Sequence, residues 1–239
     1  QRFDITGGDI LIEGKGLGGK ETGSLAILSR AVRINAGIWA KDLHITTGAN
    51  SIDAKTLEAS AIEGKGGRPA FALDTAAIGG MYAGRITLVG TEKGLGVNNS
   101  GTWSAEDNLI LDWNGDLKNS GTIYSKGNTD LRASRLENDK TIAAGKDITI
   151  SADGHVTNTG TVGAGINEIG KLTETGTLEI QSRRVDNRQG NLLAGNRLGI
   201  FSGSLSNVKG QISGYGTFHT AAEEIDNTDG KISFIGDVS

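Results

Sequence analysis

The sequence has no cysteine and only one proline, Pro69, among its 239 residues. A chain without cysteine is compatible with the cytosol, and equally with an export route in which premature disulfides would be a hazard. Aromatic residues make up 5% of the chain and apolar residues 36%. With so little apolar material we expect no thick core of many layers, although the length would allow one or two globular domains.

Long hydrophobic runs and clustered charge are missing as well. No apolar stretch approaches the roughly 18 residues of a membrane-spanning helix, so no transmembrane segment is predicted. The 24 Lys and Arg residues are nearly balanced by 28 Asp and Glu, for a net charge of −4. The basic residues form no run, whereas phosphate binding requires a clustered basic footprint. Nucleic acid is therefore not expected as a partner.

Glycine, in contrast, is abundant: there are 38 glycines, more than double the usual share of about 7%. Because proline is nearly absent, this composition indicates many tight corners rather than a disordered linker, provided that periodic apolar residues supply order. The chain begins with Gln1 rather than Met. We expect it to be processed or excised from a longer polypeptide, with any signal peptide upstream.

One pattern recurs from the middle of the chain onward: an aliphatic residue, any residue, an asparagine, and in most units a glycine soon after. The asparagines of this series are Asn99, Asn119, Asn138, Asn158, Asn187, Asn207 and Asn227. Their spacings are 20, 19, 20, 29, 20 and 20 residues. The long interval is one unit plus about nine residues, which predicts an inserted loop near 163–176. A fixed period of about 20 residues is the signature of a repeat architecture.

Each unit also carries apolar residues at fixed offsets from its asparagine. One set follows four or five residues later: Trp103, Ile123, Ile142, Val162, Leu192, Ile212 and Ile232. A second set alternates with polar residues: Leu109/Leu111, Ile148/Ile150, Leu178/Ile180 and Leu198/Ile200. Alternation at period two is typical of strands with one buried face. No helical apolar stripe is found, and the glycine density would destabilise helices.

Three short strands and three corners per unit make one coil of a solenoid. Such coils bury their inner faces only by stacking, at roughly 4.8 Å, so that each strand pairs with the coils above and below. The sequence therefore predicts an all-β fold, a right-handed parallel β-helix with about 20 residues per coil. A leucine-rich repeat is the rival solenoid, but its Leu-x-x-Leu-x-Leu-x-x-Asn frame is missing, which favours the β-helix.

The repeated asparagine has two readings. Asparagine tolerates the left-handed conformation that a corner can require, and stacked amides can hydrogen-bond along the rod as a ladder. The alternative is that asparagine and glycine only mark turns. The strict position of the asparagine favours the ladder.

The first hundred residues are less regular but contain similar short strand signals, at 10–12, 25–27, 32–34, 43–45 and 86–88. The segment from 63 to 85 is longer and contains Pro69, which predicts a loop or small hairpin outside the helix. We therefore divide the chain into 1–97, with this extra-helical loop, and the regular repeats of 98–239.

Two runs carry a family resemblance. The run from Leu28 to Leu43, with Thr47-Gly-Ala-Asn50 after it, and the run from Ala77 to Val97 resemble the later part of the secretion domain of two-partner-secretion exoproteins. The units from Asn99 onward are similar to filamentous haemagglutinin repeats. The family's Asn-Pro-containing transporter-recognition motifs have no match here, because the only proline lies in Arg68-Pro69. Transporter recognition is therefore assigned to no residue.

This resemblance implies a large protein that a dedicated outer-membrane transporter exports from a Gram-negative bacterium. Such proteins are secreted or stay at the cell surface, and include filamentous adhesins, haemolysins and effectors of contact-dependent growth inhibition. We expect a structural stalk that projects an adhesive surface or a C-terminal toxin toward a receptor on a host or neighbouring cell. A haemolysin or cytolysin is the alternative.

The sequence contains only weak signals for a catalytic or ligand-binding site. Gly14-Lys-Gly16-Leu-Gly18-Gly19 fits G-x-G-x-x-G, but Lys-Glu-Thr-Gly-Ser follows it where a dinucleotide site needs a helix. His44, His155 and His219 fall in separate coils without ligand spacing. A groove of carboxylates, as in a polysaccharide-active β-helix enzyme, would have to come from the turn residues Asp107, Asp112 and Asp116. We predict no catalytic residue, no cofactor and no metal, and hence no enzyme.

Overall fold

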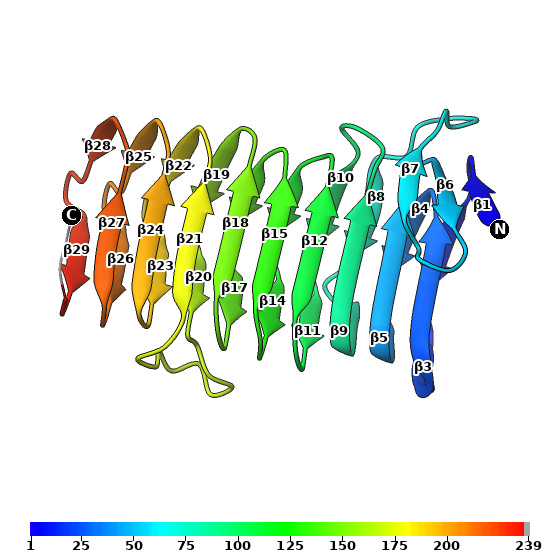
Figure 1. The fold of residues 1–239 in the computed structure, drawn as a ribbon, viewed down its shortest axis with the longest axis horizontal. Coiled ribbons are helices and arrows are strands. Elements are labelled where there is room, and N and C mark those ends of the chain that lie inside the picture. The colour runs from blue at the N-terminus through cyan, green and yellow to red at the C-terminus, as the bar shows by residue number, and fades with distance from the viewer. Residues whose placement is uncertain (237–239) are drawn as a thin grey trace.

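The protein is described here by a computed structural model that covers residues 1–236 in detail. These residues form 29 strands and no helix. The strands stack into a rod, with the two termini at opposite ends (Figure 1). All pairings between consecutive coils are parallel. In the repeats equivalent residues lie 19 or 20 positions apart, as Leu117, Leu136 and Val156 do, except across the inserted loop. The predicted all-β parallel β-helix is confirmed.

One wall of the rod is a ten-stranded sheet with one strand per coil. Its order along the rod follows the chain without a reversal. The strands are β2 (Asp9–Ile12), β4 (Ala31–Ile34), β8 (Phe71–Thr75), β10 (Gly96–Asn99), β13 (Leu117–Asn119), β16 (Leu136–Asn138), β19 (His155–Asn158), β22 (Arg184–Asp186), β25 (Ser204–Ser206) and β28 (Glu224–Asp226).

The other two walls form one sixteen-stranded sheet. They are continuous because three long strands run through both: β3 (Leu17–Ser29), β5 (Gly37–Thr47) and β9 (Gly80–Gly90). Beyond β9 each wall has its own strands. One contains β11 (Thr102–Ala105), β14 (Thr122–Ser125), β17 (Thr141–Ala144), β20 (Thr161–Ala164), β23 (Asn191–Ala194), β26 (Gln211–Gly214) and β29 (Lys231–Phe234). The other contains β12 (Leu109–Trp113), β15 (Thr129–Ala133), β18 (Ile148–Ala152), β21 (Thr177–Gln181), β24 (Arg197–Phe201) and β27 (Thr217–Thr220).

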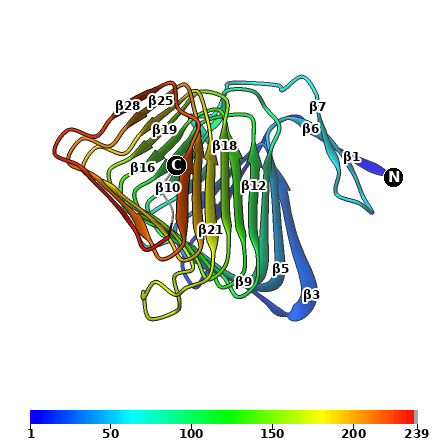
Figure 2. The same cartoon turned by 60° about the vertical axis from the view of Figure 1, so that its left-hand side comes forward.

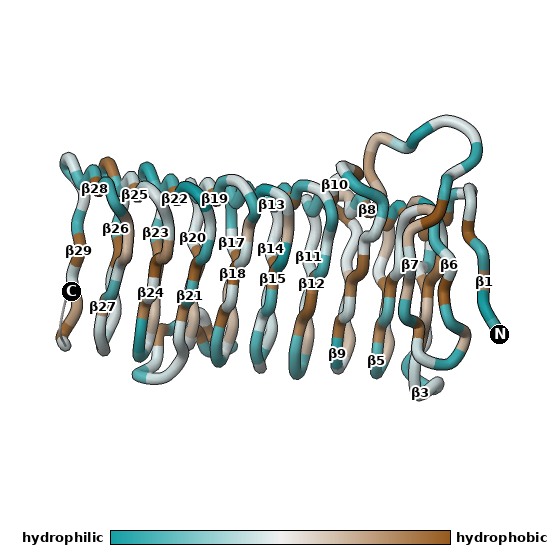
Figure 3. The backbone as a smooth tube through the Cα atoms, turned by 45° about the horizontal axis from the view of Figure 1, so that its top comes forward, coloured by the Kyte–Doolittle hydropathy of each residue, from teal (hydrophilic) through white to brown (hydrophobic). Residues whose placement is uncertain are grey.

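The core is a set of apolar columns that run along the rod axis. Alternate residues of β12 and β15 are buried and exposed, as strand geometry requires. Because the coils stack in register, each buried side chain contacts its equivalents above and below. One column contains Ile38, Met81, Trp103, Ile123, Ile142, Val162, Leu192 and Ile212, all fully buried. Apolar segments accordingly recur at matching positions in successive coils, with hydrophilic corners between them (Figure 3).

A small antiparallel sheet departs from this plan at the N-terminal end. It consists of β1 (Arg2–Ile5), β6 (Asn50–Asp53) and β7 (Ala59–Ala61), in the order β1-β6-β7. The sheet projects away from the solenoid (Figure 2). It is anchored by Ile52, whose side chain is fully buried.

The excursions from the coil differ in extent from the loops expected at 63–85 and 163–176. The first leaves after β5 and returns at β8, so residues 71–75 and 80–85 belong to solenoid strands and only 63–70 of the expected loop lie outside. Residues 71–85 were assigned to the loop because the regular period of about 20 residues begins only after them, at Asn99. The second excursion spans 165–176, since Gly163 and Ala164 end β20.

The expected backbone role of the repeated asparagines is wrong. Among the described residues, the non-glycine residues with positive φ are Leu57, Gln189, Lys209 and Asp229. Three of these stand two positions after a ladder asparagine, in turns closed by hydrogen bonds such as Gly210 N to Asn207 O at 3.0 Å. In these three coils the asparagine directly follows the strand, and the left-handed residue is a neighbour that carries no sequence signal of its own.

Candidate functional site

The structure brings all seven asparagines of the series into one column inside the rod. The side-chain Nδ2 of each of the first six donates a hydrogen bond to Oδ1 of the asparagine in the next coil. The six links are Asn99–Asn119 at 2.8 Å, Asn119–Asn138, Asn138–Asn158, Asn158–Asn187 and Asn187–Asn207 at 2.7 Å, and Asn207–Asn227 at 2.6 Å. All six amides point the same way along the axis, so their dipoles add and polarise one another.

The second amide proton of each asparagine is also used. Nδ2 of Asn119 lies 3.1 Å from the carbonyl oxygen of Gly121 in its own corner and 3.0 Å from that of Thr141 in the next coil. Asn158, Asn187 and Asn207 repeat both contacts. From Asn99 to Asn207 the asparagines are fully buried. A buried amide without partners would destabilise the fold, and here the amides from Asn99 to Asn207 are all satisfied by the next coil, most of them also by their own corner.

At the N-terminal end of the column the asparagine is replaced by a different residue type. The position equivalent to Asn99 in the preceding coil is Thr75. Its hydroxyl accepts a hydrogen bond from the indole nitrogen of Trp103 at 3.0 Å. The amide oxygen of Asn99, which has no asparagine before it, accepts from the Gly101 backbone at 3.1 Å.

Sequence reasoning missed a second column at the corner between the two walls of the large sheet. Here a side-chain oxygen accepts from the backbone N–H one coil further on. Asn108 accepts from Asn128 at 2.8 Å, Asn128 from Asp147 at 3.3 Å, and Asp147 from Thr177 at 2.8 Å. The signal was present as Asn or Asp immediately before the first three short strands of that wall, β12, β15 and β18. Its mixed residue types obscured it.

One buried ion pair holds the first excursion against the solenoid. Arg30 contacts Glu92 at 2.9 Å, and their side chains are only 7% and 18% exposed. Arg30 also donates to the carbonyl oxygen of Lys65 at 2.8 Å, and Glu92 accepts from the Ala49 backbone at 3.1 Å. The hydrogen bond from Arg30 lowers the pKa of Glu92 despite its burial. The pair therefore links three corners that are far apart in sequence.

A second charged cluster fastens the inserted loop to the preceding coils. Lys126 lies 2.5 Å from Glu106 and 2.7 Å from Glu168, which belongs to the loop. These two carboxylates raise the pKa of Lys126. The Ile166 side chain, 8% exposed, lies where a side chain on Gly163 would be. The loop thus folds back over the outer face of the rod.

The groups considered for catalysis are not brought together. The G-x-G-x-x-G run leads into strand β3, not into a helix. His44, His155 and His219 lie on β5, β19 and β27. Burial lowers the pKa of His44, whose Nε2 lies 2.8 Å from the Thr46 hydroxyl.

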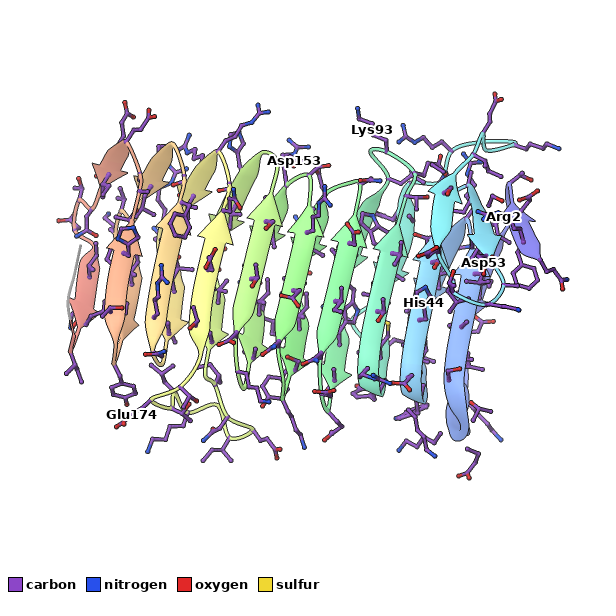
Figure 4. All side chains as sticks on the ribbon, viewed as in Figure 1. Arg2, His44, Asp53, Lys93, Asp153 and Glu174 are labelled. Carbon is purple, nitrogen blue, oxygen red and sulfur yellow. The ribbon has the colours of Figure 1, made fainter. Side chains whose placement is uncertain are left out.

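Carboxylates are likewise dispersed. Asp112 and Asp116 each face an arginine of the next coil, Arg132 and Arg135. His44, Asp153 and Glu174 lie far apart on the rod (Figure 4). Among residues 1–236, no three His, Cys, Asp or Glu side chains are grouped to hold a metal ion.

These features define a β-helical repeat protein whose coils are joined by an internal asparagine ladder. The chain belongs to the two-partner-secretion exoproteins: residues 1–123 match the TPS secretion domain, and residues 110–160, 161–217 and 173–235 match the haemagglutinin repeat. It is therefore a secreted, surface-exposed exoprotein of a Gram-negative bacterium. A secretion domain of this type implies a transporter in the outer membrane.

Curated relatives show the same relationship. The chain is 34% identical to Toxin CdiA of Escherichia coli over 219 residues, which is 89% of this chain and 6% of that protein. It is 33% identical to tRNA nuclease CdiA of Yersinia mollaretii over 216 residues, 81% of this chain and 7% of the relative. Toxin CdiA of Yersinia pestis is 39% identical over 150 residues, 53% of this chain and 4% of the relative. The chain thus spans only a small part of the length of these relatives.

No solved structure matches the chain. Residues 1–236 include no helix that is long and apolar enough to span a bilayer.

Proposed function

We propose that this chain is a stalk segment of a toxin-carrying exoprotein. The observation that carries the proposal is the unbroken stack of coils: all ten strands of the first sheet follow one another along the axis without a gap or reversal. At about 4.8 Å per coil, the nine steps of this sheet span roughly 43 Å. In a solenoid of this kind each further coil lengthens the rod, so its far end lies further from the cell surface.

The toxin carrier is favoured over the adhesin and the haemolysin by the relatives. Curated proteins that share this region are named toxins or tRNA nucleases. The segment would project the C-terminal toxin of its parent protein toward a receptor on a neighbouring cell. Export through an outer-membrane transporter would precede this. Nucleic acid would not be a partner of the stalk, several of whose basic residues, such as Lys118, Arg132 and Arg135, are paired with nearby acids.

The stalk itself would not be an enzyme. A nuclease activity of the parent protein would lie outside these residues, since the relatives named as tRNA nucleases share only about 7% or less of their length with this chain. The dispersed histidines and arginine-paired aspartates support this assignment.

Within the stalk we propose a boundary near residue 97, between the secretion part (1–97) and the repeats (98–239), at which the form of the coil changes. The last strand that runs through two walls is β9, Gly80–Gly90. Every later coil uses short strands with a corner between the walls. The asparagine ladder also begins here, at Asn99, and we propose that it fixes the stacking register of the repeats.

Deletion of one coil from the full-length exoprotein tests the stalk proposal. Removing residues 139–158 joins Asn138 to Thr159 and takes out one complete unit of 20 residues. A stalk should still be exported and should still inhibit target cells. Normal export with loss of inhibition would overturn the proposal, because it would show that this coil does more than provide length. Removal of residues 139–148, half a coil, is the matched control and should abolish folding.

A further inference from the structure

Two aromatic side chains lie side by side on the outside of the rod, at its N-terminal part. Trp39 of β5 and Tyr82 of β9 are paired in register. Their ring centroids are 6.0 Å apart and the rings are within 16° of parallel. Tyr82 is 39% exposed and Trp39 is half-buried. Large aromatic rings at the surface are unexpected in a chain with so few of them, so their position requires an explanation.

Glycines fix the orientation of both rings. A side chain on Gly37 would collide with the Trp39 indole, and one on Gly80 would collide with the Tyr82 ring. Each ring therefore lies over the glycine two residues earlier in its own strand. The underside of each ring covers backbone, and the remaining ring surface is available to a ligand. The next residue in this outer row is Ser104, which is small and leaves the side of Tyr82 open.

A bulge forms a wall beside Trp39. The pairing of β3 with β5 shifts between Gly19 and Ser24, so that residues 20–23 have no partner in β5. Together with Trp39, residues 18–22 line an open depression of about 390 Å³ on the surface of the rod. Bulges of this kind are designed features that often lie next to binding sites. Its volume and its lining, one aromatic ring and a few polar groups, fall within the range of small-ligand clefts.

We propose that this site binds an uncharged oligosaccharide. The flat apolar faces of pyranose rings stack on exposed indole and phenol rings, and their hydroxyls require polar partners at the edge. The bulge supplies Lys20, Glu21 and Thr22 for this purpose, and the opposite charges of the lysine and the glutamate leave the site neutral. Trp39 and Tyr82 stand on adjacent coils, and their ring centroids are 6.0 Å apart. This spacing is close to the length of one sugar unit in a linear polysaccharide, so consecutive sugars can each meet one ring.

Tryptophan fluorescence gives a specific test. Of the three tryptophans, Trp103 and Trp113 are buried, 0% and 2% exposed, so ligand-induced changes report on Trp39. The intact chain is titrated with cellohexaose, with hexa-N-acetylchitohexaose and, as a charged comparison, with hexagalacturonate. We expect a saturable blue shift and protection from acrylamide quenching with at least one uncharged hexasaccharide and none with hexagalacturonate. No saturable change with either uncharged probe, or equal binding of the charged one, would overturn the proposal.

Variants measured by calorimetry assign the site. Tyr82→Leu should weaken binding about tenfold, the amount that one aromatic contact supplies, and Trp39→Leu should abolish it. Tyr215→Leu, at a residue that is 38% exposed elsewhere on the rod, should leave the affinity unchanged. Thermal unfolding checks each variant, and Tyr82→Leu decides the question if Trp39→Leu does not fold. Unaltered affinity in a folded Tyr82→Leu variant would contradict the assignment.

Discussion

The side-chain Nδ2 of Asn158 donates to Oδ1 of Asn187 at 2.7 Å although 29 residues separate the two. The same distance joins Asn138 to Asn158, which are 20 residues apart. The strands on either side are equally undisturbed, since Val156 still pairs with Val185. An insertion at a corner thus leaves the register intact, because each coil is ordered by its neighbours and not by the length of chain between them.

Loss of one ladder residue should destabilise the rod measurably. Asn207→Leu removes the acceptor for Asn187 and the donor for Asn227. Leaving buried polar groups unpaired should lower the free energy of unfolding by about 1–3 kcal/mol. Chemical denaturation of the variant and of the unaltered chain measures the difference.

The control for this experiment has to avoid the second column. Asn128 lies outside the ladder series but accepts a hydrogen bond from the Asp147 backbone, so its replacement is not neutral. Asn196 is exposed at a corner. Asn196→Leu should change stability by less than about 0.5 kcal/mol, and equal effects at 196 and 207 would mean that the ladder contributes nothing.

The left-handed corner residues give a second prediction. Lys209 has φ +56°, a conformation that β-branched residues adopt only with strain. Lys209→Val should therefore destabilise the protein by about 1–2 kcal/mol. The same replacement at Lys118, an exposed strand residue, should be neutral or slightly stabilising. Melting temperatures of the two variants that fall by the same amount would contradict this account.

The Arg30–Glu92 pair should make stability depend on pH. The pKa of Glu92 is lower in the folded state than its ordinary value, so its contribution is fully present above about pH 4.3 and is lost as pH falls through the lowered value. At neutral pH, Glu92→Gln leaves the buried Arg30 charge unpaired and should lower the free energy of unfolding by about 3 kcal/mol. The difference from the unaltered chain should shrink below pH 4. A difference that is constant from pH 7 to pH 3 would exclude the ion pair as its source.

The repeats could be predicted from the sequence because each of their features follows from one period. The apolar residue after each asparagine, such as Ile123 or Ile142, is one of a column and is buried for that reason. The excursion after β5 could not be delimited in the same way. It has no repeat, and the ion pair that holds it joins Arg30 to Glu92, 62 residues apart. Nothing in local sequence specifies such a contact.

The inserted loop should be removable. Deleting the ten residues 166–175 joins Gly165 to Gly176 and leaves a corner as long as the one from Ala144 to Asp147, which is its equivalent one coil earlier. The burial of Ile166 and the contact of Glu168 with Lys126 would be lost, while the shorter closure favours folding slightly. We expect a change in the free energy of unfolding within about 1 kcal/mol, since the two effects oppose each other. Unfolding of this variant would show that the loop is part of the core structure.

The last prediction concerns how the rod forms. In a repeat array a folded coil templates the next. The first repeat buries its core residues only by packing against the coil before it. Trp103 stacks on Met81 and Leu109 on Ile86, and all four are fully buried. We propose that residues 1–97 act as the template for the repeats. An uncovered coil is seen at the opposite end, where Ile225 is 51% exposed although its equivalent Leu205 is 1% exposed.

A chain of residues 99–239 should therefore refold slowly or aggregate through its exposed first coil, whereas residues 1–239 should refold readily. Residues 1–160, which lose coils only from the other end, serve as the control and should refold like the full chain. Stopped-flow fluorescence of the buried tryptophans follows the reaction. Without cysteine, and with a single proline, neither disulfide exchange nor much prolyl isomerisation can account for a slow phase. Rapid, cooperative refolding of 99–239 would show that the repeats nucleate themselves, and the template would have to be abandoned.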